Sequence, residues 1–143
     1  MKVRDIMTEQ VIKIGAEEPV SVAARALERY NIGALPVCDQ RGNLCGMVTD
    51  RDLVTRCLAA ERAAEQTRVR DVMTSSVLTV KPDMEVSVAA HMMGRQQVRR
   101  LPVVENGMLC GMVSLGDVAN CDDSGYDAAE ALTRITGNLS SRD

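Results

Sequence analysis

The chain contains one pattern twice, and this internal repeat constrains its fold more than any other feature. The hexapeptide VRDIMT at residues 3–8 returns 66 residues later as VRDVMT at residues 69–74. The run LCGMV at residues 44–48 returns at residues 109–113, a spacing of 65. The second copy therefore has one residue fewer in the turn that precedes this run. Two copies kept in register predict two similar substructures related by a pseudo-twofold axis.

The length of the chain suggests that the two copies fold together. The chain has 143 residues, near the size of one domain, and a copy of about 60 residues is marginal if it folds alone. We therefore expect the copies to share a core. The predicted division is residues 1–66 for the first copy with a connecting helix, 67–121 for the second copy, and 122–143 for a tail. In the tail, residues 127–135 are expected to form one short helix ending at Gly137, followed by a polar, frayed end at 138–143.

Each copy has the pattern of a strand, a helix, two further strands and a last helix, so the predicted fold class is mixed α/β, with two such units packed into one module. Short β-branched runs predict the strands, and Asn106-Gly107 between two apolar runs is a strong hairpin signal. The predicted strands are 11–14, 35–38, 44–48, 77–80, 101–104 and 109–113. Two of the predicted helices start near Val20 and Val86, and two others span residues 50–65 and 115–121.

The first helix of each copy shows apolar residues at the i, i+3, i+4, i+7 spacing of one buried face. The predicted buried positions are Val20, Ala23, Ala24, Leu27 and Tyr30 in the first copy and Val86, Ala89, Ala90 and Met93 in the second. Because Trp and Phe are absent, the core must be built from aliphatic residues and methionine.

Composition excludes several function classes. The net charge of -3 and the dispersed Lys and Arg residues argue against nucleic-acid or membrane-surface binding. No apolar stretch approaches the length of a membrane span and the N-terminus lacks a signal peptide's apolar region, so we expect a cytoplasmic protein.

The five cysteines contain no Cys-x-x-Cys pair, which fits neither a disulfide framework nor a zinc site, and we expect no metal. Buried small hydrophobes are the favoured interpretation of these residues. A redox role for Cys57 or Cys121 stays open as the alternative.

Catalytic patterns are missing from the sequence. The single histidine, His91, falls within a predicted helix and is expected to face solvent, so no Ser/His/Asp or Cys/His set can be assembled. There is no P-loop and no glycine-rich dinucleotide fingerprint. We therefore expect a protein that is not an enzyme and requires no cofactor.

The most specific local pattern is a hydroxyl followed three residues later by an acid, directly after a predicted strand. It occurs as Thr49 with Asp52 and again as Ser114 with Asp117. One interpretation is a capping box that satisfies the amides of a first helical turn. The other is a ligand site, because such a helix start accepts a phosphate and a carboxylate suits the hydroxyls of a ribose. Both interpretations remain open at this point.

Taken together, the opening hexapeptide, the Leu-Pro-Val strand and the Gly-x-x-Thr/Ser-x-x-Asp ending resemble a tandem CBS-domain pair, also called a Bateman module. The resemblance covers about residues 3–121 and is nearest to small stand-alone bacterial CBS-pair proteins. It implies a regulatory fold that binds adenosine-containing ligands, such as AMP, ADP, ATP, NAD or S-adenosylmethionine, in two clefts between the units. Each cleft would combine the hydroxyl-x-x-acid motif of one unit with the opening segment of the other.

Carried onto this sequence, the resemblance implies two ligand sites. One would be lined by Ser114, Asp117, Met112, Arg99, Arg100, Thr8, Ile12, Gly33 and Ala34. The other would use Thr49, Asp52, Met47, Thr74 and Leu78. The acids would hold ribose hydroxyls, the hydroxyl residues would meet ribose or phosphate, and apolar side chains with strand backbone would hold adenine.

The two predicted sites differ in charge. The first copy has Gly33-Ala34 where the second has Arg99-Arg100, and only guanidinium groups can hold a phosphate through charge-assisted bonds. The site with Ser114 and Asp117 is therefore predicted to bind a phosphorylated adenosine more tightly. A solvated basic pair is the alternative interpretation, and Gly116 weakens the helix start beside Asp117.

The resemblance also implies a homodimer, whose head-to-head or head-to-tail arrangement stays open, and a regulated protein partner is compatible with it. The alternative function is a ligand-independent interaction or dimerisation protein that keeps the CBS-pair fold as a structural element.

Overall fold

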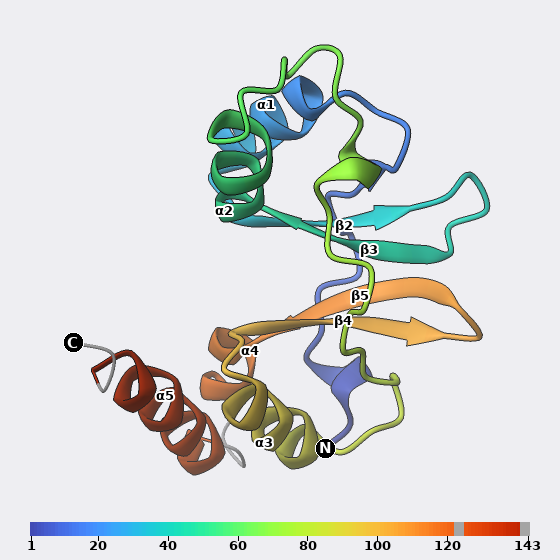
Figure 1. Ribbon diagram of the computed structural model, residues 1–143. Helices are drawn as coiled ribbons and strands as arrows, with labels where there is room; N and C mark the ends of the chain where they lie inside the picture. The colour runs from blue at the N-terminus through green and yellow to red at the C-terminus, as the bar shows by residue number, and fades with distance from the viewer. Residues whose placement is uncertain (122–124, 141–143) are drawn as a thin grey trace. The chain divides into compact units, whose positions relative to one another are not determined.

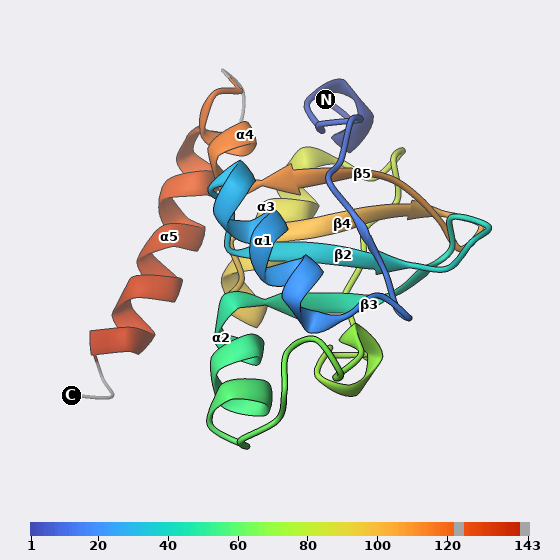
Figure 2. The same cartoon turned by 90° about the horizontal axis from the view of Figure 1, so that it is seen from above.

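The computed structural model describes residues 1–121 and 125–140, which form two compact units. Unit 1 consists of Met1–Val11, Leu78–Asn106 and Cys110–Asp143, and unit 2 of Ile12–Val77 with Gly107–Leu109. The opening segment of each sequence copy therefore belongs to the compact unit built mainly from the other copy. Figures 1 and 2 show the elements of each unit.

Unit 2 contains a small three-stranded sheet with strand order β1-β2-β3. Strand β1 pairs in parallel with β2, which pairs antiparallel with β3. The elements of this unit are β1 (Ile14–Gly15), α1 (Val20–Tyr30), β2 (Ala34–Cys38), β3 (Leu44–Thr49), α2 (Asp50–Asp52), the π-helix η2 (Leu53–Leu58) and the 3-10 helix η3 (Val69–Asp71).

Unit 1 repeats this arrangement and adds a helix. Val80 forms an isolated parallel bridge with Val103 beside the β4-β5 hairpin. The hairpin turns through positive φ values at Asn106 (53°) and Gly107 (82°), which confirms the Asn-Gly prediction. The elements are η1 (Val3–Asp5), α3 (Val86–Gln96), β4 (Arg100–Glu105), β5 (Met108–Ser114), α4 (Leu115–Ala119) and α5 (Gly125–Ser140).

Each unit has its own apolar core, and each core combines both sequence copies. Val3 of the first copy is fully buried in the cluster that contains Val86, Leu101 and Val113. Val69 and Val72 of the second copy are fully buried in the cluster of the first copy's strands. The single shared core expected from the sequence is therefore replaced by two clusters that exchange their opening segments.

The predicted strands at 11–14 and 77–80 are shorter in the structure. The first is reduced to β1, and the second to the bridge at Val80. The reason is topological, because the chain passes from one compact unit to the other at Val11 and again at Val77. Only the end of each run reaches a strand partner.

The predicted helix over 50–65 is wrong beyond residue 58. The helix becomes a π-helix, in which Ala59 donates to the Val54 carbonyl, and Glu61 has a positive φ of 58°. The following segment turns back, so that Val20 N donates to the Thr67 carbonyl at 2.8 Å and Ser21 N donates to the Ala64 carbonyl at 3.1 Å. Satisfying the free amides at the start of α1 outweighs the helix propensity of this alanine-rich stretch.

The predicted buried faces of the two equivalent helices have different outcomes. In α3 all four predicted positions are buried, whereas in α1 Ala24 and Tyr30 are exposed. The tail helix is also longer than predicted, because α5 runs through Gly137 to Ser140. Of the frayed end predicted at 138–143, residues 138–140 instead belong to α5, and residues 141–143 lie outside the described residues.

Candidate functional site

The hydroxyl-x-x-acid pattern forms the same geometry at the end of β3 and at the end of β5. Thr49 Oγ1 accepts a hydrogen bond from Asp52 N at 3.0 Å, and Asp52 Oδ2 accepts one from Thr49 N at 3.0 Å. Ser114 Oγ and Asp117 Oδ2 make the same two bonds at 3.0 and 2.8 Å. Both pairs are complete capping boxes, so the structural interpretation of the pattern is confirmed. Each box uses only one oxygen of its carboxylate.

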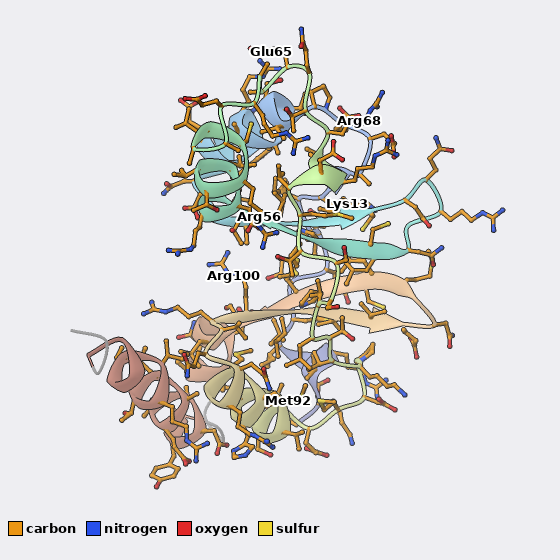
Figure 3. The ribbon with its side chains drawn as sticks, in the orientation of Figure 1. Lys13, Arg56, Glu65, Arg68, Met92 and Arg100 are labelled. Atoms are coloured by element: carbon orange, nitrogen blue, oxygen red, sulfur yellow. The ribbon has the colours of Figure 1, made fainter. Side chains whose placement is uncertain are left out.

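The second carboxylate oxygen has different surroundings in the two copies. Asp52 Oδ1 lies 3.8 Å from Arg56 Nε, and Asp52 is buried. Arg56, labelled in Figure 3, also donates through Nη1 to the carbonyls of Val72 and Met73 at 3.0 and 3.2 Å. The repeat places Cys121 at the position of Arg56. Within residues 1–121 and 125–140, no cation forms an ion pair with Asp117.

Arg56 is a residue that the sequence analysis missed. It stands four residues after Asp52, at the spacing of a helical ion pair, and this spacing is the signal that could have identified it. Its second role, holding the opening segment of the other copy, depends on a long-range contact that no local pattern reports.

The opening segments reach the strands that precede the two capping boxes. Thr8 and Met112 exchange backbone hydrogen bonds of 2.9 and 3.0 Å in unit 1. Thr74 and Met47 do the same in unit 2, at 2.8 and 3.0 Å. Thr8 and Met112 therefore share unit 1 with Ser114 and Asp117, while Thr74 and Met47 share unit 2 with Thr49 and Asp52.

The arginine pair lies at the entrance to α4. The Arg99 carbonyl accepts a 2.7 Å hydrogen bond from Leu115 N, which fixes Arg99 beside the first residue of this helix. Arg100, labelled in Figure 3, begins β4. Both side chains are exposed, and among the described residues neither forms an ion pair.

The equivalent place in unit 2 has the opposite charge. The Gly33 carbonyl accepts a 3.0 Å hydrogen bond from Asp50 N, and a Cβ placed on Gly33 would lie 3.5 Å from Asp50 Oδ2. Asp50 stands where the second copy has Leu115. The residues beside this helix start therefore carry positive charge in unit 1 and negative charge in unit 2.

Four predicted site residues lie in the unit opposite to the rest of their site. Ile12, Gly33 and Ala34 belong to unit 2, and Leu78 belongs to unit 1. Ile12 and Leu78 are among the exposed large apolar side chains.

A separate open cavity of about 780 Å³ lies in unit 2, and none of the predicted ligand residues lines it. Its wall includes Cys38 and Cys45, which are free thiols. Burial is the main cause that raises the pKa of both thiols, and the Lys13 ammonium partly opposes this shift at Cys38. Both cysteines are therefore weak nucleophiles at neutral pH.

Cys57, Cys121 and His91 follow their predicted exposure, whereas Cys45 and Cys110 are only partly buried. Cys57 and Cys121 are buried and His91 is exposed. In the part of the chain that the structure describes, no group of three or more His, Cys, Asp or Glu side chains could hold a metal ion. Within the same ranges, no helix combines the length and the apolar character needed to cross a bilayer.

Comparison with known proteins agrees with the repeat. Residues 3–59 and 69–124 each match the CBS domain family. The chain is 40% identical over 134 residues to the CBS domain-containing protein YhcV of Bacillus subtilis (strain 168), a match that covers 94% of each chain.

Two similar solved structures contain adenosine ligands. The structure of CBSX2 in complex with AMP is 30% identical, with a TM-score of 0.73, covering 82% of this chain and 92% of that one. The CBS domain pair of protein MJ0100, in complex with 5-methylthioadenosine and S-adenosyl-L-methionine, is 28% identical, with a TM-score of 0.72, covering 83% and 93%.

Proposed function

Because the chain belongs to the CBS domain family and carries two such domains, we propose that it is a regulatory module that binds an adenosine-containing ligand, with the tighter site in unit 1. The AMP, methylthioadenosine and S-adenosylmethionine complexes of its structural relatives support this ligand class. The module acts in the cytoplasm without catalysing a reaction, as a homodimer whose geometry or partner binding changes with the ligand.

The observation that carries this proposal is the difference in charge between the two copies. Unit 1 has Arg99, Arg100 and the uncharged Leu115, while unit 2 has Gly33, Ala34 and the carboxylate of Asp50. A charge-assisted hydrogen bond is roughly twice as strong as a neutral one, and a carboxylate repels a phosphate. An adenosine monophosphate therefore prefers unit 1.

In this proposal the ribose is held by Asp117. Its Oδ2 is committed to the capping box, and its Oδ1 is the oxygen that can accept from a ribose hydroxyl. In unit 2 the corresponding oxygen of Asp52 faces Arg56, so ribose binding there must compete with an existing ion pair. The adenine would contact Thr8 and Met112 in unit 1, and in the weaker site Thr74 and Met47 in unit 2.

The experiment that tests the ligand is isothermal titration of the full chain with AMP, adenosine and S-adenosylmethionine. Asp117→Asn should weaken AMP binding about tenfold or more, because a hydrogen bond to a charged group contributes about 1.5–3 kcal/mol. The matched variant Asp52→Asn should leave the tight site unchanged. Arg99→Ala with Arg100→Ala should weaken AMP more than adenosine, since only AMP carries a phosphate. Equal losses from Asp117→Asn and Asp52→Asn would contradict the ranking of the sites.

A thermal-shift panel separates this function from the ligand-independent one. A ligand at 100 times its dissociation constant should add about 2.7 kcal/mol to the free energy of unfolding. If no adenosine ligand shifts the melting temperature, the fold serves interaction or dimerisation alone. Light scattering with and without ligand tests the homodimer.

A further inference from the structure

The open cavity of about 780 Å³ in unit 2 is separate from the proposed adenosine sites, since none of their residues lines it. Its wall carries two free thiols, Cys38 at the end of β2 and Cys45 in β3. Cys38 is buried and Cys45 is partly buried, and both border the cavity. The cavity therefore offers two sulfur atoms to a ligand on one wall.

The pairing of β2 with β3 brings these two cysteines together. Cys38 pairs with Leu44, whereas the preceding residue of β2 pairs with Gly46. Cys45 is therefore the additional residue of a β-bulge, in which two residues of β3 lie opposite Cys38. Burial is the main cause that raises the pKa of Cys38, and a charge on Cys45 adds to this rise. The two thiols are thus within electrostatic reach of each other.

The two sequence copies differ around this pair of thiols. The second copy has Val104 at the position of Cys38, so its equivalent strand lacks the first thiol. It also has Lys81 at the position of Gly15, which lines the cavity and is the β1 partner of Cys38. Neighbouring partners in a sheet point to the same face, so the absence of a side chain at Gly15 keeps space beside the Cys38 thiol. The pair of thiols is a feature of the first copy.

The expected separation of the two side chains favours a metal bridge over a disulfide. Opposite residues on antiparallel strands have Cβ atoms about 4.5–5.5 Å apart, whereas a disulfide needs roughly 3.5–4.5 Å. A metal–thiolate bond of about 2.3 Å lets two sulfur atoms on one ion lie up to about 4.6 Å apart. Soft thiolate ligands select monovalent copper, which accepts two of them, while zinc takes four ligands.

Lys13 supplies the charge that such a complex needs. Two thiols lose two protons when they bind Cu⁺, so the ion with its two thiolates carries one negative charge. A buried charge is costly unless an opposite charge lies near it. Lys13, labelled in Figure 3, lines the cavity, and its ammonium opposes the rise that burial causes in the pKa of Cys38. Within residues 1–121 and 125–140, Lys13 forms no ion pair.

We propose that Cys38 and Cys45 form a site for one monovalent copper ion in the cavity of unit 2, with both sulfur atoms as ligands and the Lys13 ammonium as the balancing charge. The step involves no oxidation or reduction, because the ion binds and leaves as Cu⁺ and the two thiol protons pass to solvent. The site does not depend on the proposed adenosine function.

Competition for Cu⁺ with the chelator bicinchoninate tests the site in the reduced full chain. The visible absorbance of the copper–bicinchoninate complex should fall until one ion is bound per chain. Cys38→Val, which installs the second copy's residue, should weaken Cu⁺ binding about a hundredfold or more, because one sulfur ligand is lost. Cys45→Ser should have a similar effect and changes a less buried position. Failure to withdraw copper from bicinchoninate, or full affinity in either variant, would overturn the proposal.

The matched control is Cys110→Ser in the second copy. Cys110 is the repeat equivalent of Cys45 and is also partly buried, but Val104 takes the place of the second thiol. The affinity for Cu⁺ should therefore stay unchanged in this variant. Equal losses from Cys45→Ser and Cys110→Ser would show that copper binds to any accessible thiol, and would overturn the proposal.

The balancing charge and the choice of ion are tested in the same assay. Lys13→Met should weaken Cu⁺ binding about tenfold, whereas Lys13→Arg should keep most of the affinity because it retains the charge. Unchanged binding in Lys13→Met would remove Lys13 from the site. Zn²⁺ at the same concentration should not displace Cu⁺, since two sulfur atoms provide only half of the ligands that zinc takes. Displacement of Cu⁺ by Zn²⁺ would overturn the assignment of the ion.

Discussion

At the scale of single residues, two glycines explain how an opening segment can cross a strand of the other copy. Gly46 and Gly111 occupy the same repeat position. A Cβ placed on Gly111 would lie 2.6 Å from the Thr8 carbonyl oxygen, and one on Gly46 would lie 2.5 Å from the Thr74 carbonyl oxygen. Only glycine permits the backbone of the opening segment to pair there.

Gly111→Ala should lower the free energy of unfolding by about 2–4 kcal/mol, because the added methyl group must displace the Thr8 backbone and its two hydrogen bonds to Met112. Urea denaturation measures the change. Gly137→Ala is the matched control, because a Cβ placed on Gly137 meets no atom within 4 Å. It lies within α5, so alanine should stabilise that helix by about 0.5–1 kcal/mol. Equal losses from both variants would contradict the close approach.

Asp39 provides a prediction on pH. Its carboxylate accepts hydrogen bonds from the Asn43 side chain at 3.1 Å and from Asn43 N and Arg41 N at 2.9 Å, and the side-chain bond is the main cause that lowers its pKa. Its stabilisation is therefore present above the ordinary aspartate pKa and is lost as the pH falls through the lowered folded pKa. In an NMR titration, Asn43→Ala should move the Asp39 pKa back toward its ordinary value. Gln40→Ala should leave it low.

At the scale of secondary-structure elements, the sequence predicts what local pattern controls. The hairpins, α1, α3 and both capping boxes follow from turn residues, apolar spacing and the Thr/Ser-x-x-Asp motif, and all of them are present. The element that was predicted wrongly, the helix over 50–65, is altered by distant partners. The carbonyls of Thr67 and Ala64 accept hydrogen bonds from the first backbone amides of α1. The local sequence of residues 59–65 gives no sign of this long-range pairing.

The sign of the stability change caused by one substitution, Glu61→Gly, distinguishes the predicted helix from the observed turn. Glu61 has a left-handed φ of 58°, which costs a residue with a side chain about 1–2 kcal/mol. Glu61→Gly should therefore stabilise the protein by about 0.5–1 kcal/mol in thermal or urea unfolding. If residues 50–65 were one continuous helix, the same change would destabilise it by about 1 kcal/mol. A loss of stability would thus contradict the turn.

At the scale of the whole molecule, the repeat predicts two similar substructures and their internal order, and the structure confirms this. The repeat does not reveal that the opening segments are exchanged between the cores. Val3 and Val69 are equivalent residues in equivalent motifs, so the sequence pattern is compatible with each valine in the core of either unit. The same limit applies to the candidate sites. Their residue types follow from the motif, but the hydrogen bonds of Arg56 to the Val72 and Met73 carbonyls and the covering of α3 by α5 arise from contacts between distant segments.

The exchange of opening segments predicts that two fragments of equal length will fold differently. The fragment 12–77 contains nearly all of unit 2, including Val69 and Val72 of its core and the Thr67 carbonyl that accepts from Val20 N. The fragment 1–66 contains the whole first sequence copy but lacks these residues. Losing two fully buried valines removes about 3–6 kcal/mol of stabilisation, which is most of what a core of this size provides.

The fragment 12–77 should therefore give a cooperative urea transition and dispersed amide resonances, and the fragment 1–66 should give neither. Adding a peptide of residues 67–77 to the fragment 1–66 should restore dispersed resonances, because the peptide supplies the two missing core valines and the missing helix-capping carbonyl. If the fragment 1–66 folds as well alone as the fragment 12–77, the opening segment of the second copy does not belong to the core of unit 2. That outcome would make each sequence copy its own folding unit, in contrast to the buried positions of Val69 and Val72.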